Sequence, residues 1–265
     1  MYAQTKDGLN IYYEIKGNVE AKEHIIFLNG LSQATVSWSF MLPCFEEKYR
    51  LILMDFIFQG QSDKTGEWRT FDTHAEDVVQ VLQATHTKKV IVIGISYGSL
   101  VAQHLAVNYP EYVKKLVLLS TFAHKTPYFE VIEYSWWKAL EIGGYSLMFD
   151  IMLPTVLSEE YFKNPLIPIE TLRKIRQESN PNKEALFKLM YATKERRDYR
   201  TELKKIQAPT LVIHGENDRL ITLSMGAEAA RHIPNAVFKI IPNAGHTLNM
   251  EKIQEVCAEI LKFLG

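Results

Sequence analysis

A serine between two glycines, in the run Gly94-Ile95-Ser96-Tyr97-Gly98, is the feature of this sequence best suited to covalent chemistry. The β-branched run 89–93 before it predicts a strand, and the helix-forming run 99–106 after it predicts a helix. At such a turn, Gly-x-Ser-x-Gly is typical of a nucleophile elbow, in which a tight backbone exposes the serine hydroxyl. The first amides of the helix then face the position where an oxyanion would form. We therefore predict that Ser96 is a nucleophile.

Two loops supply the partners that a serine nucleophile needs. A hydroxyl is a weak nucleophile at neutral pH and requires a base, which a third group orients. Asp218 follows the predicted strand 209–214, and His246 follows the predicted strand 237–241. Because the carboxyl ends of parallel strands form one functional face, we expect Ser96, Asp218 and His246 to converge there.

Other residues compete for the roles of base and acid. His124 follows the predicted strand 115–120 but precedes the expected acid, and His214 ends a strand, where a buried structural role is the simpler interpretation. Glu216 and Asp55 are rival acids. Asp218 is preferred because it stands further into its loop, and the order Ser, Asp, His is that of one known hydrolase fold.

The elements that must position these residues alternate between strand and helix patterns in the first half of the chain. Such alternation predicts a mostly parallel sheet covered by helices. An Asp7-Gly8 turn predicts a hairpin at the start. The predicted strands are 3–5, 9–15, 24–29, 50–55, 89–93, 115–120, 209–214 and 237–241, and the predicted helices are 36–47, 72–85, 99–106, 223–232 and 249–264.

A helical insertion is predicted between the sixth and seventh strands. From 122 to 205 no strand pattern stands out, and aromatic residues and methionines recur at helical spacing. Prolines are expected to divide this stretch into short helices; they are Pro127, Pro154, Pro165, Pro168 and Pro181. We predict a core of residues 1–121 and 206–265, with an inserted cap of residues 122–205.

Composition excludes several classes of function. Of 265 residues, 47% are hydrophobic and 23% charged, and the net charge of −1 gives no case for a nucleic-acid partner. Cys44 and Cys257 lack metal or redox spacing, so we expect no metal and no cofactor. No apolar run approaches the ~20 residues of a membrane span, and the first residues lack an apolar signal core. We expect a cytoplasmic monomer or homodimer that acts on a small molecule.

Together, the elbow at Ser96, the acid and histidine loops and the placed insertion resemble the α/β-hydrolase-fold serine hydrolases that carry a helical cap. The resemblance covers nearly the whole chain and implies a mostly parallel eight-stranded sheet. It also implies that the backbone amides of Leu31 and Tyr97 form the oxyanion hole. The sequence departs from the family at Asn29, where His is usual before Gly30, and at Ile57 and Phe58, where Arg and Gly are common.

The resemblance implies hydrolysis of a small or medium apolar ester, lactone or thioester through an acyl-enzyme on Ser96. Candidate substrate-binding residues are Asn29, Trp38, Trp136 and Trp137, although core packing is an equal alternative for each tryptophan. Adjacent helical positions face different ways, so one of the last two is expected to reach a pocket. Alternatives are a C–C bond hydrolase or lyase of the same fold, a triad-retaining small-molecule receptor and a non-catalytic scaffold.

Overall fold

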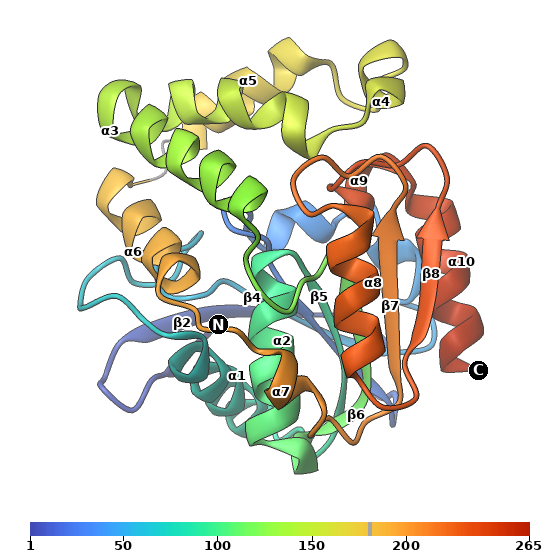
Figure 1. The fold of residues 1–265 in the computed structure, drawn as a ribbon. Helices are drawn as coiled ribbons and strands as arrows, with labels where there is room; N and C mark the ends of the chain where they lie inside the picture. Colours follow the sequence, from blue (N-terminus) through green and yellow to red (C-terminus); the bar gives the residue numbers. More distant parts are fainter. Residues whose placement is uncertain (180–181) are drawn as a thin grey trace.

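The computed structural model describes residues 1–179 and 182–265, and its centre is one eight-stranded sheet (Figure 1). Its strand order is β1-β2-β4-β3-β5-β6-β7-β8. The β1/β2 and β2/β4 pairs are antiparallel, and the remaining pairs are parallel. The strands are β1 (Tyr2–Gln4), β2 (Asn10–Gly17), β3 (His24–Leu28), β4 (Arg50–Met54), β5 (Val90–Ile95), β6 (Val113–Leu119), β7 (Thr210–Gly215) and β8 (Val237–Ile241).

Helices cover both faces of the sheet. The alternation of side chains along β3 sends Ile26 and Leu28 to one hydrophobic cluster and Ile25 and Phe27 to another. The first cluster includes residues of α1 (Phe71–Ala84), α2 (Tyr97–Asn108) and α8 (Leu223–His232), and the second includes residues of α10 (Ile253–Leu264). The predicted α/β class and mostly parallel eight-stranded sheet are therefore confirmed.

Between β6 and β7 the described residues form helices and connecting loops. They are α3 (Pro127–Val156), α4 (Glu159–Lys163), α5 (Ile169–Ser179), α6 (Lys183–Lys194) and α7 (Arg200–Leu203). Figure 1 shows α3, α4 and α5 beyond the carboxyl ends of β7 and β8. No helix within the described part of the chain is both long and apolar enough to cross a bilayer.

The prolines divide this segment only in part: Pro165 and Pro168 lie between α4 and α5, as expected, whereas two others lie within α3. Pro127 occupies the first turn of α3, where its missing N–H costs nothing, and Pro154 lies in the last turn of the same helix. The interruption inside α3 is at Gly144, whose φ of 65° joins two helical pieces. Pro181 lies outside the described residues.

The predicted helix 36–47 is wrong. The segment forms two short 3₁₀ helices, Thr35–Trp38 and Leu42–Cys44. Three of its large apolar side chains, Trp38, Met41 and Phe45, pack into the second hydrophobic cluster, whereas Phe40 is exposed. Irregular turns bring all three to the core, and Pro43 inside the segment opposes a continuous helix.

Candidate active site

Ser96 lies on a strained turn between β5 and α2. Its φ of 51° and ψ of −117° are unusual for a residue with a side chain. The turn leaves no room for a side chain at either glycine. A Cβ on Gly94 would overlap the carbonyl of Gly98, and a Cβ on Gly98 would overlap the carbonyl of Leu28. The Ser96 amide donates to the carbonyl of Leu119 on β6 at 2.9 Å. The backbone thus has the form of an elbow at the carboxyl end of the central strands.

Asp218 and His246 meet at the same end of the sheet. Nδ1 of His246 lies 2.8 Å from Oδ2 of Asp218, and these residues are only 5% and 6% exposed, respectively. Oδ1 of Asp218 accepts hydrogen bonds from the amides of Leu220 and Ile221, at 3.0 and 2.9 Å. Because the carboxylate is held by the backbone, it can orient the imidazole ring.

His246 is fixed by its backbone as well. The hydroxyl of Ser120 donates to the His246 carbonyl at 2.8 Å, and the His246 amide donates to the Val156 carbonyl at 3.1 Å. These contacts come from the residue that follows β6 and from the end of α3. The histidine loop therefore joins the sheet to the helical segment above it.

The rival histidines have nearer partners than Asp218, although Nε2 of His214 also lies 3.4 Å from Oδ2 of Asp218. His214 is fully buried, and its Nε2 lies 2.7 Å from the Ile221 carbonyl. Burial lowers the pKa of this imidazole, which favours its neutral form. Nδ1 of His124 lies 2.8 Å from Oε2 of Glu228 on α8. Neither histidine lines the two cavities described below.

The rival acids connect loops. The buried carboxylate of Asp55 accepts hydrogen bonds from the amides of Thr35 and Gln61, both at 2.8 Å. Glu216 accepts one from the amide of Asn243 at 3.0 Å. Both carboxylates therefore have structural roles in these loops, and neither needs a catalytic role to account for its presence.

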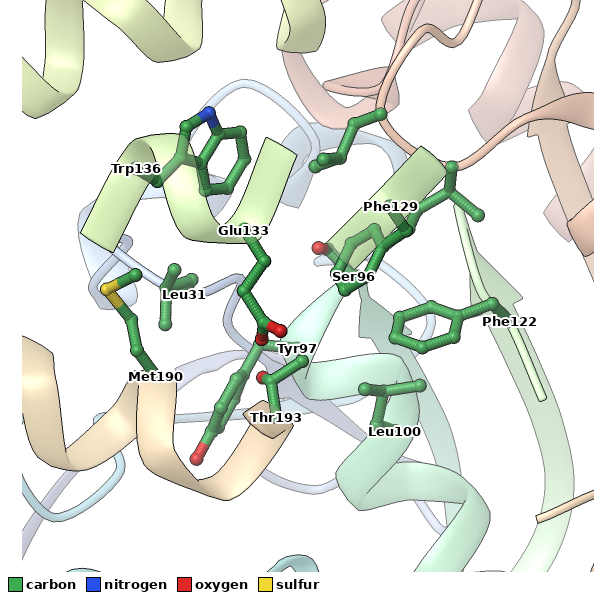
Figure 2. A pocket seen from close by; sticks show the side chains of 12 residues that line it. Leu31, Ser96, Tyr97, Leu100, Phe122, Phe129, Glu133, Trp136, Met190 and Thr193 are labelled. Atoms are coloured by element: carbon green, nitrogen blue, oxygen red, sulfur yellow. The ribbon is translucent and has the colours of Figure 1, made fainter. Parts of the chain in front are cut away.

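Two cavities meet at Ser96. The larger, about 1460 Å³ with the space open to solvent, is also lined by His246 and by residues of α3 and α5. The smaller, about 470 Å³, is shown in Figure 2. Leu31, Ser96, Trp136 and Leu220 line both. Ser96 thus faces a divided, mostly apolar space.

Leu31 and Tyr97, the expected sources of the oxyanion amides, line the smaller cavity together with Ser96. A residue that sequence reasoning did not assign, Gln59, holds the Leu31 loop. Its Nε2 donates to the carbonyls of Gly30 and Leu31, at 2.8 and 3.0 Å. The sequence offered one signal for Gln59: it directly follows Ile57 and Phe58, where the chain departs from the family pattern.

Asn29 and Trp38, which the sequence suggested for substrate binding, lie outside the lining of the two cavities described above. Both side chains are fully buried. Nε1 of Trp38 donates to Oδ1 of Asn29 at 2.8 Å, and Nδ2 of Asn29 donates to the Met54 carbonyl at 2.8 Å. Asn29 is used here because it satisfies a buried indole donor and a buried carbonyl at once.

The adjacent tryptophans of α3 point to different surroundings, as their spacing predicts. Trp136 lines both cavities. Trp137 packs against Phe187 and Tyr191, with ring centroids 4.7 and 4.8 Å apart. Trp137 lies outside the lining of both cavities, because its ring packs against α6.

Glu133 was missed by sequence reasoning and lies in the smaller cavity. Among the described residues that line the two cavities, it is the one Asp, Glu, Lys or Arg. Burial raises the pKa of its carboxyl. The sequence held no signal for it, because Glu130 one turn earlier looks the same and is exposed.

Among the side chains that the structure describes, in residues 1–175 and 182–265, no three or more of His, Cys, Asp or Glu form a cluster suited to a metal ion. The histidine and carboxylates of the candidate site have the protein partners given above. The arrangement can supply a hydroxyl, an oriented imidazole and backbone amides to a small apolar substrate.

Comparison with known proteins gives a consistent result. The sequence matches the family described as alpha/beta hydrolase fold over residues 23–253. The uncharacterized hydrolase YugF of Bacillus subtilis is 26% identical over 98% of this chain and 96% of its own length. A 2-hydroxy-6-oxononadienedioate/2-hydroxy-6-oxononatrienedioate hydrolase of Paraburkholderia phymatum is 27% identical, over 97% of this chain and 91% of its own. The crystal structure of MGS-M2, an alpha/beta hydrolase enzyme from a Medee basin deep-sea metagenome library, has a TM-score of 0.87 and 28% identity, over 97% of this chain and 94% of its own.

Proposed function

Since the chain belongs to the alpha/beta hydrolase family, we propose that it is a serine hydrolase that cleaves a small or medium apolar ester, lactone or thioester. The observation that carries this proposal is the 2.8 Å contact between His246 and Asp218, together with the opening of His246 and Ser96 onto one cavity. An oriented imidazole beside a serine on an elbow is the arrangement that acyl transfer requires.

The proposed reaction has two acyl-transfer steps. Oγ of Ser96 attacks the acyl carbon while Nε2 of His246 takes the hydroxyl proton and Asp218 stabilises the imidazolium that forms. The amides of Leu31 and Tyr97 receive the oxyanion, and each such donor is worth roughly 10²–10³ in turnover. The protonated histidine then gives its proton to the leaving group, which is the alkoxide of an ester or lactone or the thiolate of a thioester. Water, deprotonated by His246, attacks the acyl-enzyme and frees Ser96.

The apolar lining of the cavities supports the choice of substrate class. The larger cavity carries Phe149, Met152 and Leu153 from α3 and Leu172 from α5. We propose that the helices between β6 and β7, within the segment 122–205, act as a cap that excludes water and shapes the acyl and alcohol sites.

A C–C bond hydrolase is the second candidate, and the Paraburkholderia relative is named as the hydrolase of an oxo-dicarboxylate. A dicarboxylate calls for a cationic partner in the site. The described residues that line the two cavities include no Lys or Arg. This lining favours the uncharged ester, lactone or thioester.

The test is intact-protein mass after reaction with a fluorophosphonate, in the wild type, Ser96→Ala and His246→Ala. We expect one adduct on the wild type, none on Ser96→Ala and strongly slowed labelling of His246→Ala. Multiple turnover of short p-nitrophenyl esters would separate an enzyme from a receptor, which would give one slow modification. A folded wild type that neither labels nor turns over any chain length would overturn the proposal.

A further inference from the structure

The smaller cavity beside Ser96 contains a carboxylate that the proposed chemistry does not use. Glu133 projects from α3 toward Tyr97 and Thr193, beneath Trp136 (Figure 2). Apart from Thr193 and the elbow residues, the walls are apolar side chains, among them Leu100, Phe122 and Met190. The side chain of Glu133 is only 14% exposed. An acidic group at this place is surrounded by little that can solvate it.

The two oxygens of Glu133 differ in their surroundings. Oε2 lies 3.5 Å from Nζ of Lys125, which also donates to the Lys194 carbonyl at 2.6 Å. Oε1 is buried and has no hydrogen-bond partner among the residues that the structure describes. A buried acceptor without a donor is costly, and more so when it is charged. The same oxygen is available to a donor on a bound molecule.

The electrostatics of the cavity favour an uncharged donor. Lys125 already balances the charge of Glu133, so a second cation would enter an apolar space without a counter-ion of its own. A substrate carboxylate would meet a like charge. A hydroxyl avoids both costs and supplies the hydrogen that Oε1 lacks.

We propose that this cavity is a subsite for the part of the substrate that bears a hydroxyl, which donates to Oε1 of Glu133 while the scissile carbonyl lies at Ser96. The substrate is then a hydroxy ester, lactone or thioester rather than a plain alkyl one. This inference rests on the proposed function and names the substrate class of the same site. Glu133 acts in it as a specificity-determining residue.

The first test compares isosteric esters, because a methyl group replaces a hydroxyl with little change of shape. Ethyl 3-hydroxybutanoate and ethyl 3-methylbutanoate place the difference on the acyl side, and 3-hydroxybutyl and 3-methylbutyl butanoate place it on the alcohol side. Hydrolysis is followed by pH-stat. In at least one pair we expect kcat/KM for the hydroxy ester to exceed that of its isostere by about 10- to 100-fold, the range of a hydrogen bond to a charged group.

Glu133→Leu should reduce that ratio to near one, and Glu133→Met is the second variant in case the first does not fold. Glu130→Leu is the matched control, because Glu130 stands one turn away on α3 outside the cavity lining and is exposed. It should keep the wild-type ratio. Two results would overturn the inference: equal rates within both pairs in the wild type, or a wild-type ratio of kcat/KM values in Glu133→Leu and Glu133→Met. Ethyl 3-aminobutanoate, if cleaved faster than the hydroxy ester at pH 7, would overturn it in favour of a cation site.

A binding measurement separates this inference from the proposed function. In Ser96→Ala, calorimetry should show the hydroxy ester binding more tightly than its isostere, and the further change Glu133→Leu should remove the difference. If the wild type neither labels nor hydrolyses, the proposed function fails, and the same titration on the wild type still decides the subsite. Equal binding of the hydroxy ester and its isostere to Ser96→Ala and to the wild type would contradict the subsite.

Discussion

Oε2 of Glu251 accepts a hydrogen bond from the backbone amide of Gly245 at 3.1 Å and so holds the residue that precedes His246. The same oxygen accepts one from the amide of Ser158 at 3.0 Å, and Oε1 accepts one from that of Thr247 at 3.3 Å. One carboxylate therefore binds both neighbours of the candidate base and the chain just after α3. Glu251 is a positioning residue for the histidine loop.

Glu251→Ala should lower kcat and the rate of fluorophosphonate labelling by about 10-fold or more, because the loop loses charge-assisted hydrogen bonds worth about 1.5–3 kcal/mol each. KM should change less, since Glu251 does not line either cavity. Glu255→Ala, an exposed acid on α10, is the control. A lower melting temperature with an unchanged labelling rate would mean that Glu251 is merely structural.

Asp218→Asn should lower kcat by about 10⁴-fold, because an amide favours the wrong tautomer of the histidine ring. Circular dichroism and thermal melting should show a folded protein, since the amide oxygen can still accept from Leu220 and Ile221. Turnover within tenfold of the wild type would contradict the proposed role of Asp218.

Gly98→Ala should prevent folding or cost several kcal/mol, because its Cβ would overlap the carbonyl of Leu28 on the neighbouring strand. Gly144→Ala is the matched change in open space, where the positive φ alone should cost about 1–2 kcal/mol. Urea unfolding measures both. Similar losses at the two sites would show that the elbow tolerates a side chain.

Glu133→Leu should stabilise the fold, and by more at pH 8 than at pH 4.5. The carboxyl has a raised pKa, caused first by burial and opposed by Lys125 and Lys194, while Glu130 adds to it. The folded state therefore binds this proton more tightly than the unfolded state, so the wild type loses stability as the pH rises above about 4.5 through the folded pKa.

The measurement for Glu133→Leu is the difference in melting temperature between variant and wild type at the two pH values. Glu130→Leu, which changes an exposed acid, should show a much smaller difference. A gain that is larger at pH 4.5 than at pH 8 would contradict a raised pKa in the folded state.

Local sequence patterns were sufficient to predict most of the strands and helices. The helix 223–232 and the strand 237–241 occur as predicted, and the other strands differ by one to three residues at their ends. Helix ends were harder to predict: α1 begins at Phe71, after Thr70, whose hydroxyl accepts from the Thr73 amide, rather than at residue 72 as predicted. Each end depends on one hydrogen bond, which periodicity does not reveal.

The sequence alone determined which chemistry was available. Glycines at the elbow, an acid after one strand and a histidine after the next are consecutive local features, and the parallel sheet brings such strand ends together. Tertiary packing decided which other side chains reach Ser96. Trp38 is buried against Asn29 and Trp137 is covered by α6, whereas Trp136 and Glu133 enter the cavities. Periodicity identifies the face of a helix but not the neighbour that covers it, because that neighbour comes from a distant part of the chain.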